Sequence, residues 1–169
     1  MITTTRLILA PVTLDDFEES YAMTADPETT AYISAKPFTR EETWGRTLRN
    51  IGHWAAFGYG IFTVRERSTG AYVGETGLAH FARGLGEAFD PFPEGAWVLA
   101  RQTHGKGYAT EAVLAVHGWM AGHKPTPRTV CIIDPDNAPS LRVAGKLGYR
   151  PFGQTEYRAK TVIMLVRRA

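Results

Sequence analysis

A short glycine-containing turn between an apolar strand and a long amphipathic helix most restricts how this chain can fold. Residues 102–107 of the turn read Gln-Thr-His-Gly-Lys-Gly. Gly105 and Gly107 have no Cβ, so the backbone can bend tightly there and approach a ligand closely. The helix that follows begins with unpaired N–H groups at its positive end. These features suit a diphosphate, but a strand-to-helix turn without a ligand accounts for the two glycines equally well.

Three familiar nucleotide-binding motifs do not match this turn. The Rossmann motif needs Gly or Ala where Thr110 stands, and the turn lies too late in the chain. A P-loop would require Ser or Thr after Gly105-Lys106, and Gly107 is found there. The glycine loop of protein kinases lies between antiparallel strands, whereas a helix follows here.

The hydrophobic pattern predicts a single α/β domain that covers residues 1–169, a length that suits one domain. Thr13, Asp26 and Thr39 are the expected starts of three early helices, and Gly148 is the expected left-handed stop of a late one. The third helix carries Trp44, Leu48, Ile51 and Ala55 on one face. Later helices are expected at 107–122 and 138–147, and strands at 7–9, 60–66, 72–81, 96–100, 129–133, 149–157 and 161–167.

Charge and cysteine content exclude several functions. With 19 basic and 17 acidic residues the net charge is only +2, which gives no general affinity for nucleic acid. The single cysteine, Cys131, rules out an internal disulfide and a multi-cysteine metal site, and its apolar neighbours predict a core position. The five histidines show no metal-ligand spacing, so no metal is expected.

Nothing in the sequence predicts an association with membranes. Residues 1–6 lack a basic leader followed by an apolar stretch, and no apolar run approaches the ~20 residues that span a bilayer. We therefore expect a soluble, cytoplasmic protein.

The pattern Gln102-x-x-Gly105-x-Gly107 resembles the Gln/Arg-x-x-Gly-x-Gly/Ala signature of the GNAT superfamily of N-acetyltransferases. Residues 94–112 and the opening residues 5–9 resemble its branch that acts on the N-termini of ribosomal proteins (RimJ/RimL-type). A second family motif is present at residues 136–140 and is followed by Gly148-Tyr149. These motifs cover most of the chain in a compatible order.

The resemblance implies a mixed, mostly antiparallel sheet of six to seven strands, flanked by helices, with a splayed central strand pair. It also implies acetyl-CoA as cosubstrate, with its pantetheine arm beside the backbone of Trp97, Val98 and Leu99. An N–H near Trp97 or Val98 would polarise the thioester carbonyl. Asn137 would bind the arm, although it also suits an N-cap before Pro139. The implied cofactor-binding residues are Trp97, Val98, Leu99, Gln102, His104, Gly105, Lys106, Gly107, Tyr108, Ala109 and Asn137.

Direct acetyl transfer requires a neutral amine, so a carboxylate base is expected. Glu94 occupies the position where the family often places a catalytic glutamate, and Glu75 is the second candidate. Many relatives place a tyrosine seven residues after the motif asparagine, where this chain has Ala144. Ser140 is therefore the expected donor to the leaving thiolate, as implied for the ribosomal-protein branch. Tyr108 and Tyr149 are weaker candidates and are better explained as packing residues.

The acceptor site is expected near Trp44, Trp54, Phe57, Tyr59 and the loop over residues 84–95. Because this loop carries Glu87, Asp90 and Glu94, we expect it to attract a cationic amine.

The leading acceptor is the α-amine of a protein or peptide N-terminus. A small amine such as an amino acid, a polyamine or an aminoglycoside is the alternative, and a non-catalytic acetyl-CoA-binding module is a third reading. The sequence leaves open whether the chain forms a homodimer.

Overall fold

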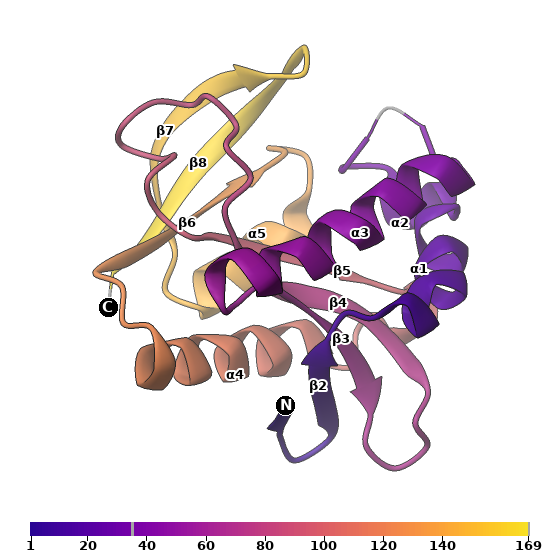
Figure 1. Cartoon of the computed structure of the whole chain (residues 1–169). Helices are drawn as coiled ribbons and strands as arrows, with labels where there is room; N and C mark the ends of the chain where they lie inside the picture. Colours follow the sequence, from indigo (N-terminus) through magenta and orange to yellow (C-terminus); the bar gives the residue numbers. More distant parts are fainter. Residues whose placement is uncertain (35, 169) are drawn as a thin grey trace.

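The computed structural model of the chain describes residues 1–34 and 36–168, which form one twisted sheet with helices on both faces (Figure 1). The strands are β1 (Ile2–Thr3), β2 (Leu7–Pro11), β3 (Ile61–Glu66), β4 (Tyr72–Ala79), β5 (Glu94–Leu99), β6 (Arg128–Ile133), β7 (Arg150–Tyr157) and β8 (Lys160–Arg168). The α-helices are α1 (Phe17–Thr24), α2 (Pro27–Thr30), α3 (Arg40–Phe57), α4 (Tyr108–His123) and α5 (Ala138–Lys146). Short 3₁₀ turns, η1 and η2, cover Leu14–Asp16 and Arg101–Thr103.

The strand order is β1-β2-β3-β4-β5-β6-β8-β7, and every neighbouring pair except β5 and β6 is antiparallel. This confirms the mixed, mostly antiparallel sheet. Within the described residues it has eight strands, where six to seven were expected. The additional one is β1, which pairs with β2 at the edge and is too short to show an alternating pattern.

The central strands β5 and β6 diverge soon after they meet. In the part of the chain that the structure describes, they pair at one position, Glu94 with Val130. In contrast, β5 pairs with β4 along its whole length, from Glu94 to Leu99. Because backbone groups alternate in direction along a strand, every second residue of β5 turns its N–H and C=O away from β4. The expected splay is present.

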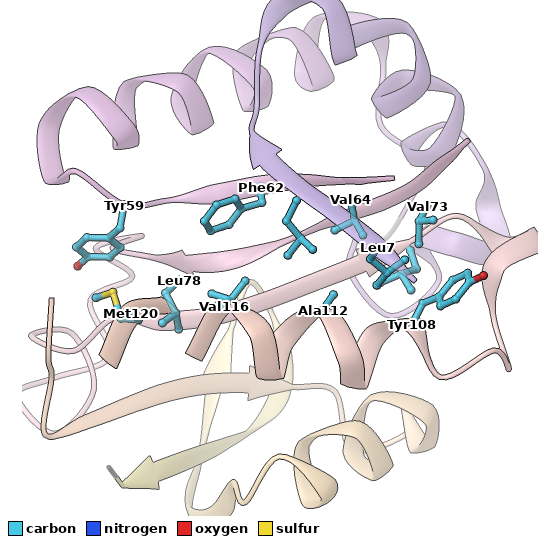
Figure 2. Close-up of a cluster of buried hydrophobic side chains, with 12 residues drawn as sticks. Leu7, Tyr59, Phe62, Val64, Val73, Leu78, Tyr108, Ala112, Val116 and Met120 are labelled. Atoms are coloured by element: carbon cyan, nitrogen blue, oxygen red, sulfur yellow. The ribbon is translucent and has the colours of Figure 1, made fainter. Parts of the chain in front are cut away.

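The main core lies between the sheet and α4, as Figure 2 shows. Gly107, with φ 78°, is the N-cap of this helix, as the sequence predicts. Side chains of α4 pack against β2, β3, β4 and β5 in a cluster that includes Leu7, Leu9, Phe62, Val64, Val73, Leu78, Leu99, Tyr108, Ala112, Val116 and Met120. Cys131 is buried in a second cluster near α5, as expected.

Helix α3 differs from expectation in the side that it presents to the protein. Thr39 caps it as predicted and accepts a hydrogen bond from the Glu42 N–H. Trp44 and Leu48 are exposed, however, and the inward face is polar; its buried residues are Thr43, Thr47, Asn50 and His53. The reason is that α3 lies over polar groups of β4. None of the described helices has the length and apolar composition needed to cross a bilayer.

A buried polar chain connects α4 to β6. The ring nitrogen Nε2 of His117 lies 3.2 Å from the Tyr149 hydroxyl, which lies 2.9 Å from Oγ1 of Thr129. Burial lowers the pKa of His117 to about 4, and the positive charge of Arg167 adds to the effect. The imidazole is therefore neutral in the folded protein at pH 7.

This shift predicts a loss of stability in mild acid. Below pH ~6.5 the unfolded chain binds a proton at His117 that the folded chain does not bind until about pH 4. The free energy of unfolding should thus fall by up to about 3 kcal/mol between these pH values. Urea denaturation at several pH values should show a smaller fall for His117→Gln than for the wild type. His123→Gln, at an exposed site, is the control, and an unchanged slope in His117→Gln would refute the assignment.

Candidate active site

A cavity of about 1080 Å³ lies between α3 and the diverging strands. One wall is formed by β5, β6 and the start of α5, and the opposite wall by α3. The turn between β7 and β8 contributes Tyr157, Arg158 and Lys160. The gap between the strands therefore opens into the space under α3.

Most of the residues expected at the pantetheine arm lie at this gap. Trp97 and Val98 line the cavity from β5, and Asn137 and Ser140 line it from α5. Leu99 instead is buried in the core under α4, so only its backbone can contribute. Asn137 Oδ1 accepts a hydrogen bond from the Ser140 N–H at 3.1 Å, which makes Asn137 the N-cap of α5. Its side-chain amino group is the part that could contact a ligand.

The glycine turn lies at the far end of β5 and has the backbone conformation that glycine permits. Gly105 and Gly107 have φ values of 75° and 78°. Arg6, the residue before β2, holds the turn, because its Nη1 donates to the Lys106 carbonyl at 2.8 Å and its Nη2 pairs with Glu111 at 2.6 Å. The ring of His104 lies 2.8 Å from the Leu99 carbonyl. The turn is thus fixed from both sides before any ligand is bound.

The other residues predicted around the turn fall into two groups. Gln102 and Lys106 are exposed and can meet an anion, whereas the exposed ring of His104 is held by the Leu99 carbonyl. Tyr108 is buried, and its hydroxyl donates to Glu66, so it packs under the turn. Ala109 is partly buried against the same core.

Glu94 lies at the start of β5 and is 4% exposed. Both of its oxygens accept hydrogen bonds from Arg83, at 2.6 and 2.8 Å. Burial raises the pKa of Glu94, and the pairing with Arg83 opposes this rise without cancelling it. Both side chains line the cavity, so Glu94 combines access to the site with a strengthened basicity.

Glu75 is enclosed on all sides. It is 2% exposed and pairs with Arg46 at 2.8 Å. Its oxygens also accept hydrogen bonds from Ser20 at 2.5 Å and from Tyr72 at 3.2 Å. Burial raises the pKa of Tyr72, so this phenol keeps the proton that it donates. The cavity lining includes Arg46 but not Glu75, whose geometry indicates a structural anion.

The loop carboxylates give little support to the prediction that this loop attracts a cation, which stays a prediction. Asp90 accepts hydrogen bonds from the N–H groups of Gly84 and Gly86, and Glu87 is exposed outside the cavity. Of the loop carboxylates only Glu94 lines the cavity, where Arg83 neutralises it. The basic residues of the lining are Arg46, Arg49, Arg83, Arg158 and Lys160. Its acidic residues are Glu42, Glu94 and Asp134.

The aromatic residues expected near the acceptor site only partly line the cavity. Phe57 lines the cavity, but Trp44, Trp54 and Tyr59 do not. Trp54 packs edge-on against Phe62 and belongs to the core side of the sheet. Arg46 and Arg49 were not predicted at the site. Their spacing of three on a helix with Asn50 and His53 nevertheless indicates a shared polar face.

Comparisons with known proteins agree with this geometry. Residues 6–150 match the sequence profile of the acetyltransferase (GNAT) domain. The chain is 30% identical over 152 residues to the uncharacterised N-acetyltransferase YnaD of Bacillus subtilis. The aligned residues cover 90% of this chain and 84% of YnaD. A Bordetella pertussis structure assigned to the GnaT family of acetyltransferases has 30% identity and a TM-score of 0.87, with 98% of both chains covered.

A spermidine N-acetyltransferase from Vibrio cholerae, solved with CoA and spermine, has the same fold at 14% identity and a TM-score of 0.77, with 98% of this chain and 96% of that chain covered. The profile match and the two relatives at 30% identity show that the chain belongs to the GNAT family of acetyltransferases.

Removal of the Glu75 charge should destabilise the fold far more than removal of an exposed carboxylate. Glu75→Gln leaves the inward guanidinium of Arg46 without its anion, and breaking a buried pair in this way costs about 3–5 kcal/mol. Glu18→Gln breaks the exposed pair with Arg40, which solvent screens, so this change should alter the stability little. Urea denaturation of both variants measures the contrast, and equal losses would show that Glu75 is not a structural anion.

Proposed function

We propose that this chain transfers the acetyl group of acetyl-CoA directly to the α-amine of a protein or peptide N-terminus, as RimJ/RimL-type enzymes do. The observation that supports this most is the continuous cavity from the strand gap to α3, with Glu94 in its lining. In this proposal the thioester enters from the gap and the amine from the side of α3.

The residues present fit acetyl-CoA. The unpaired edge of β5 offers N–H and C=O groups to the amides of a pantetheine arm, and the Gly105–Gly107 turn offers helix N–H groups to a diphosphate. The Vibrio cholerae relative shows that this fold can hold CoA.

The chemistry assigns a role to each candidate. A β5 N–H near Trp97 or Val98 polarises the thioester carbonyl. The amine nitrogen attacks the carbonyl carbon, the C–N bond forms and the C–S bond breaks. Glu94 accepts the amine proton, directly or through water, and Ser140 donates a hydrogen bond to the departing thiolate.

The strength of the base favours an α-amine over a lysine-like amine. The pKa of an α-amine is about 7.7–8.0 and that of a lysine-like amine about 10.4, a difference worth about 3 kcal/mol in the cost of deprotonation. Even with its raised pKa, the Glu94 carboxylate is a weak base beside either amine, so it suits the less demanding one. The excess of arginine around the cavity also disfavours polyamines and aminoglycosides, which carry several positive charges.

Glu94→Gln should lower kcat about 10²-fold or more at pH 7, because general base catalysis is worth about that much. Since burial raises the pKa of Glu94, wild-type activity should be lost as the pH falls through this pKa and present above it. The deficit of Glu94→Gln should shrink towards pH 9, where an α-amine is already neutral. The measurement is kcat for a peptide acceptor from pH 5 to pH 9.

Glu87→Gln, in the same loop but exposed, should behave as the wild type. A deficit of Glu94→Gln that is constant with pH would mean that Glu94 only positions Arg83. Tight acetyl-CoA binding without product from any acceptor would instead indicate a non-catalytic binding module. A rate that persists as a peptide acceptor is lengthened would exclude a small-molecule acceptor.

A further inference from the structure

We infer that the acceptor amine carries a carboxylate close to its reacting nitrogen, and that the arginine group (Arg46, Arg49, Arg83 and Arg158) binds it. This inference rests on the proposed function and specifies its acceptor. It replaces the cationic acceptor that the loop residues suggest in the sequence.

The arginine group surrounds one part of the cavity from three elements. Arg46 and Arg49 come from α3, Arg83 from the loop after β4, and Arg158 from the turn between β7 and β8. Burial lowers the pKa of Arg49, and the positive charges of the other three lower it further. An anion bound among them would relieve this repulsion.

Two of these arginines have no carboxylate partner of their own. Arg83 is neutralised by Glu94 and Arg46 by Glu75. Within the described part of the chain, Arg49 and Arg158 form no ion pair, and their guanidinium groups lie over the rings of Phe81 and Tyr157 at 5.5 and 5.3 Å. Their charges are therefore available to a ligand.

Arg46 contributes a second and independent observation. Its Nη2 pairs with Glu75, but its Nη1 is buried and has no hydrogen-bond partner among the described residues. Buried donors are nearly always paired, and Arg46 lines the cavity. A planar carboxylate offers two acceptor oxygens, which match the donor geometry of arginine.

The position of the group separates it from the expected phosphate site. Arg83 holds Glu94, the first residue of β5, whereas the glycine turn follows the last residue of this strand. The six residues of β5 span about 20 Å. An acceptor bound at the arginine group would thus present its amine near Glu94.

The test compares two tripeptide amides that begin with glutamate or glutamine. Wild-type kcat/KM should be roughly tenfold or more higher for the glutamate peptide than for the glutamine peptide, as expected for a charged hydrogen bond. Arg49→Gln should abolish this preference, because it removes a charge that binds the carboxylate. The variant should still fold, because Arg49 forms no ion pair among the described residues. Arg67→Gln, which changes the net charge equally at an exposed residue after β3, should keep it. The same pair as single amino-acid amides shows whether a small acceptor suffices.

Equal kcat/KM for the glutamate and glutamine peptides would overturn the inference and leave the proposed function standing. A rise in the KM for acetyl-CoA alone in Arg49→Gln would also overturn it, because the group would then bind the cofactor. Calorimetric titration of both peptides into the CoA-saturated protein gives a readout without turnover. Tighter binding of the glutamate peptide without acetylation would support the inference and refute the proposed function, and absence of any binding preference would refute the inference.

Discussion

The parting of β5 from β6 after one residue pair is the constraint on which the rest of this structure depends. Each strand is anchored on its outer side, β5 by β4 and β6 by β8, so the gap between them is a fixed feature of the sheet. Tyr149 contacts both strands beside this residue pair. Its hydroxyl is bonded to Thr129 of β6 and lies so close to Gly95 of β5 that a Cβ there would come within 2.6 Å. The buried ring thus lies where the strands meet, and the backbone groups that the splay leaves unpaired beyond this point need other partners.

Buried charge is balanced around the cavity by arginine pairing. Glu75 and Glu94 lie on adjacent strands, and each is held by one arginine from outside the sheet. These pairs differ in consequence, because Glu75 is closed off by Ser20 and Tyr72 while Glu94 faces the cavity. The two remaining arginines, Arg49 and Arg158, line the cavity without an ion pair among the described residues. The unpaired arginines of the lining therefore come from α3 and the β7–β8 turn.

The sequence predicted the features that depend on local rules. The tight turn at Gly105 and Gly107, the left-handed Gly148, the cap at Thr39 and the strands other than β1 follow from backbone sterics and periodicity. The sequence did not predict the features that depend on pairing between side chains far apart in the sequence. The apolar stripe of Trp44 and Leu48 marks a face of α3, but a stripe does not tell which neighbour it meets, and Glu75 draws the opposite face inward. The pairing of Arg83 with Glu94 and the capping of Gly84 and Gly86 by Asp90 were equally invisible as patterns.

The most direct test of the account is the melting temperature of the protein with acetyl-CoA, NADH or ATP, each at the same excess. A ligand at about 100 times its Kd stabilises the fold by about 2.7 kcal/mol, which raises the melting temperature of a chain of this size by several degrees. The account predicts this rise with acetyl-CoA and not with NADH or ATP. No rise with acetyl-CoA at millimolar concentration would contradict it, because the strand gap and the glycine turn would then be structural features only.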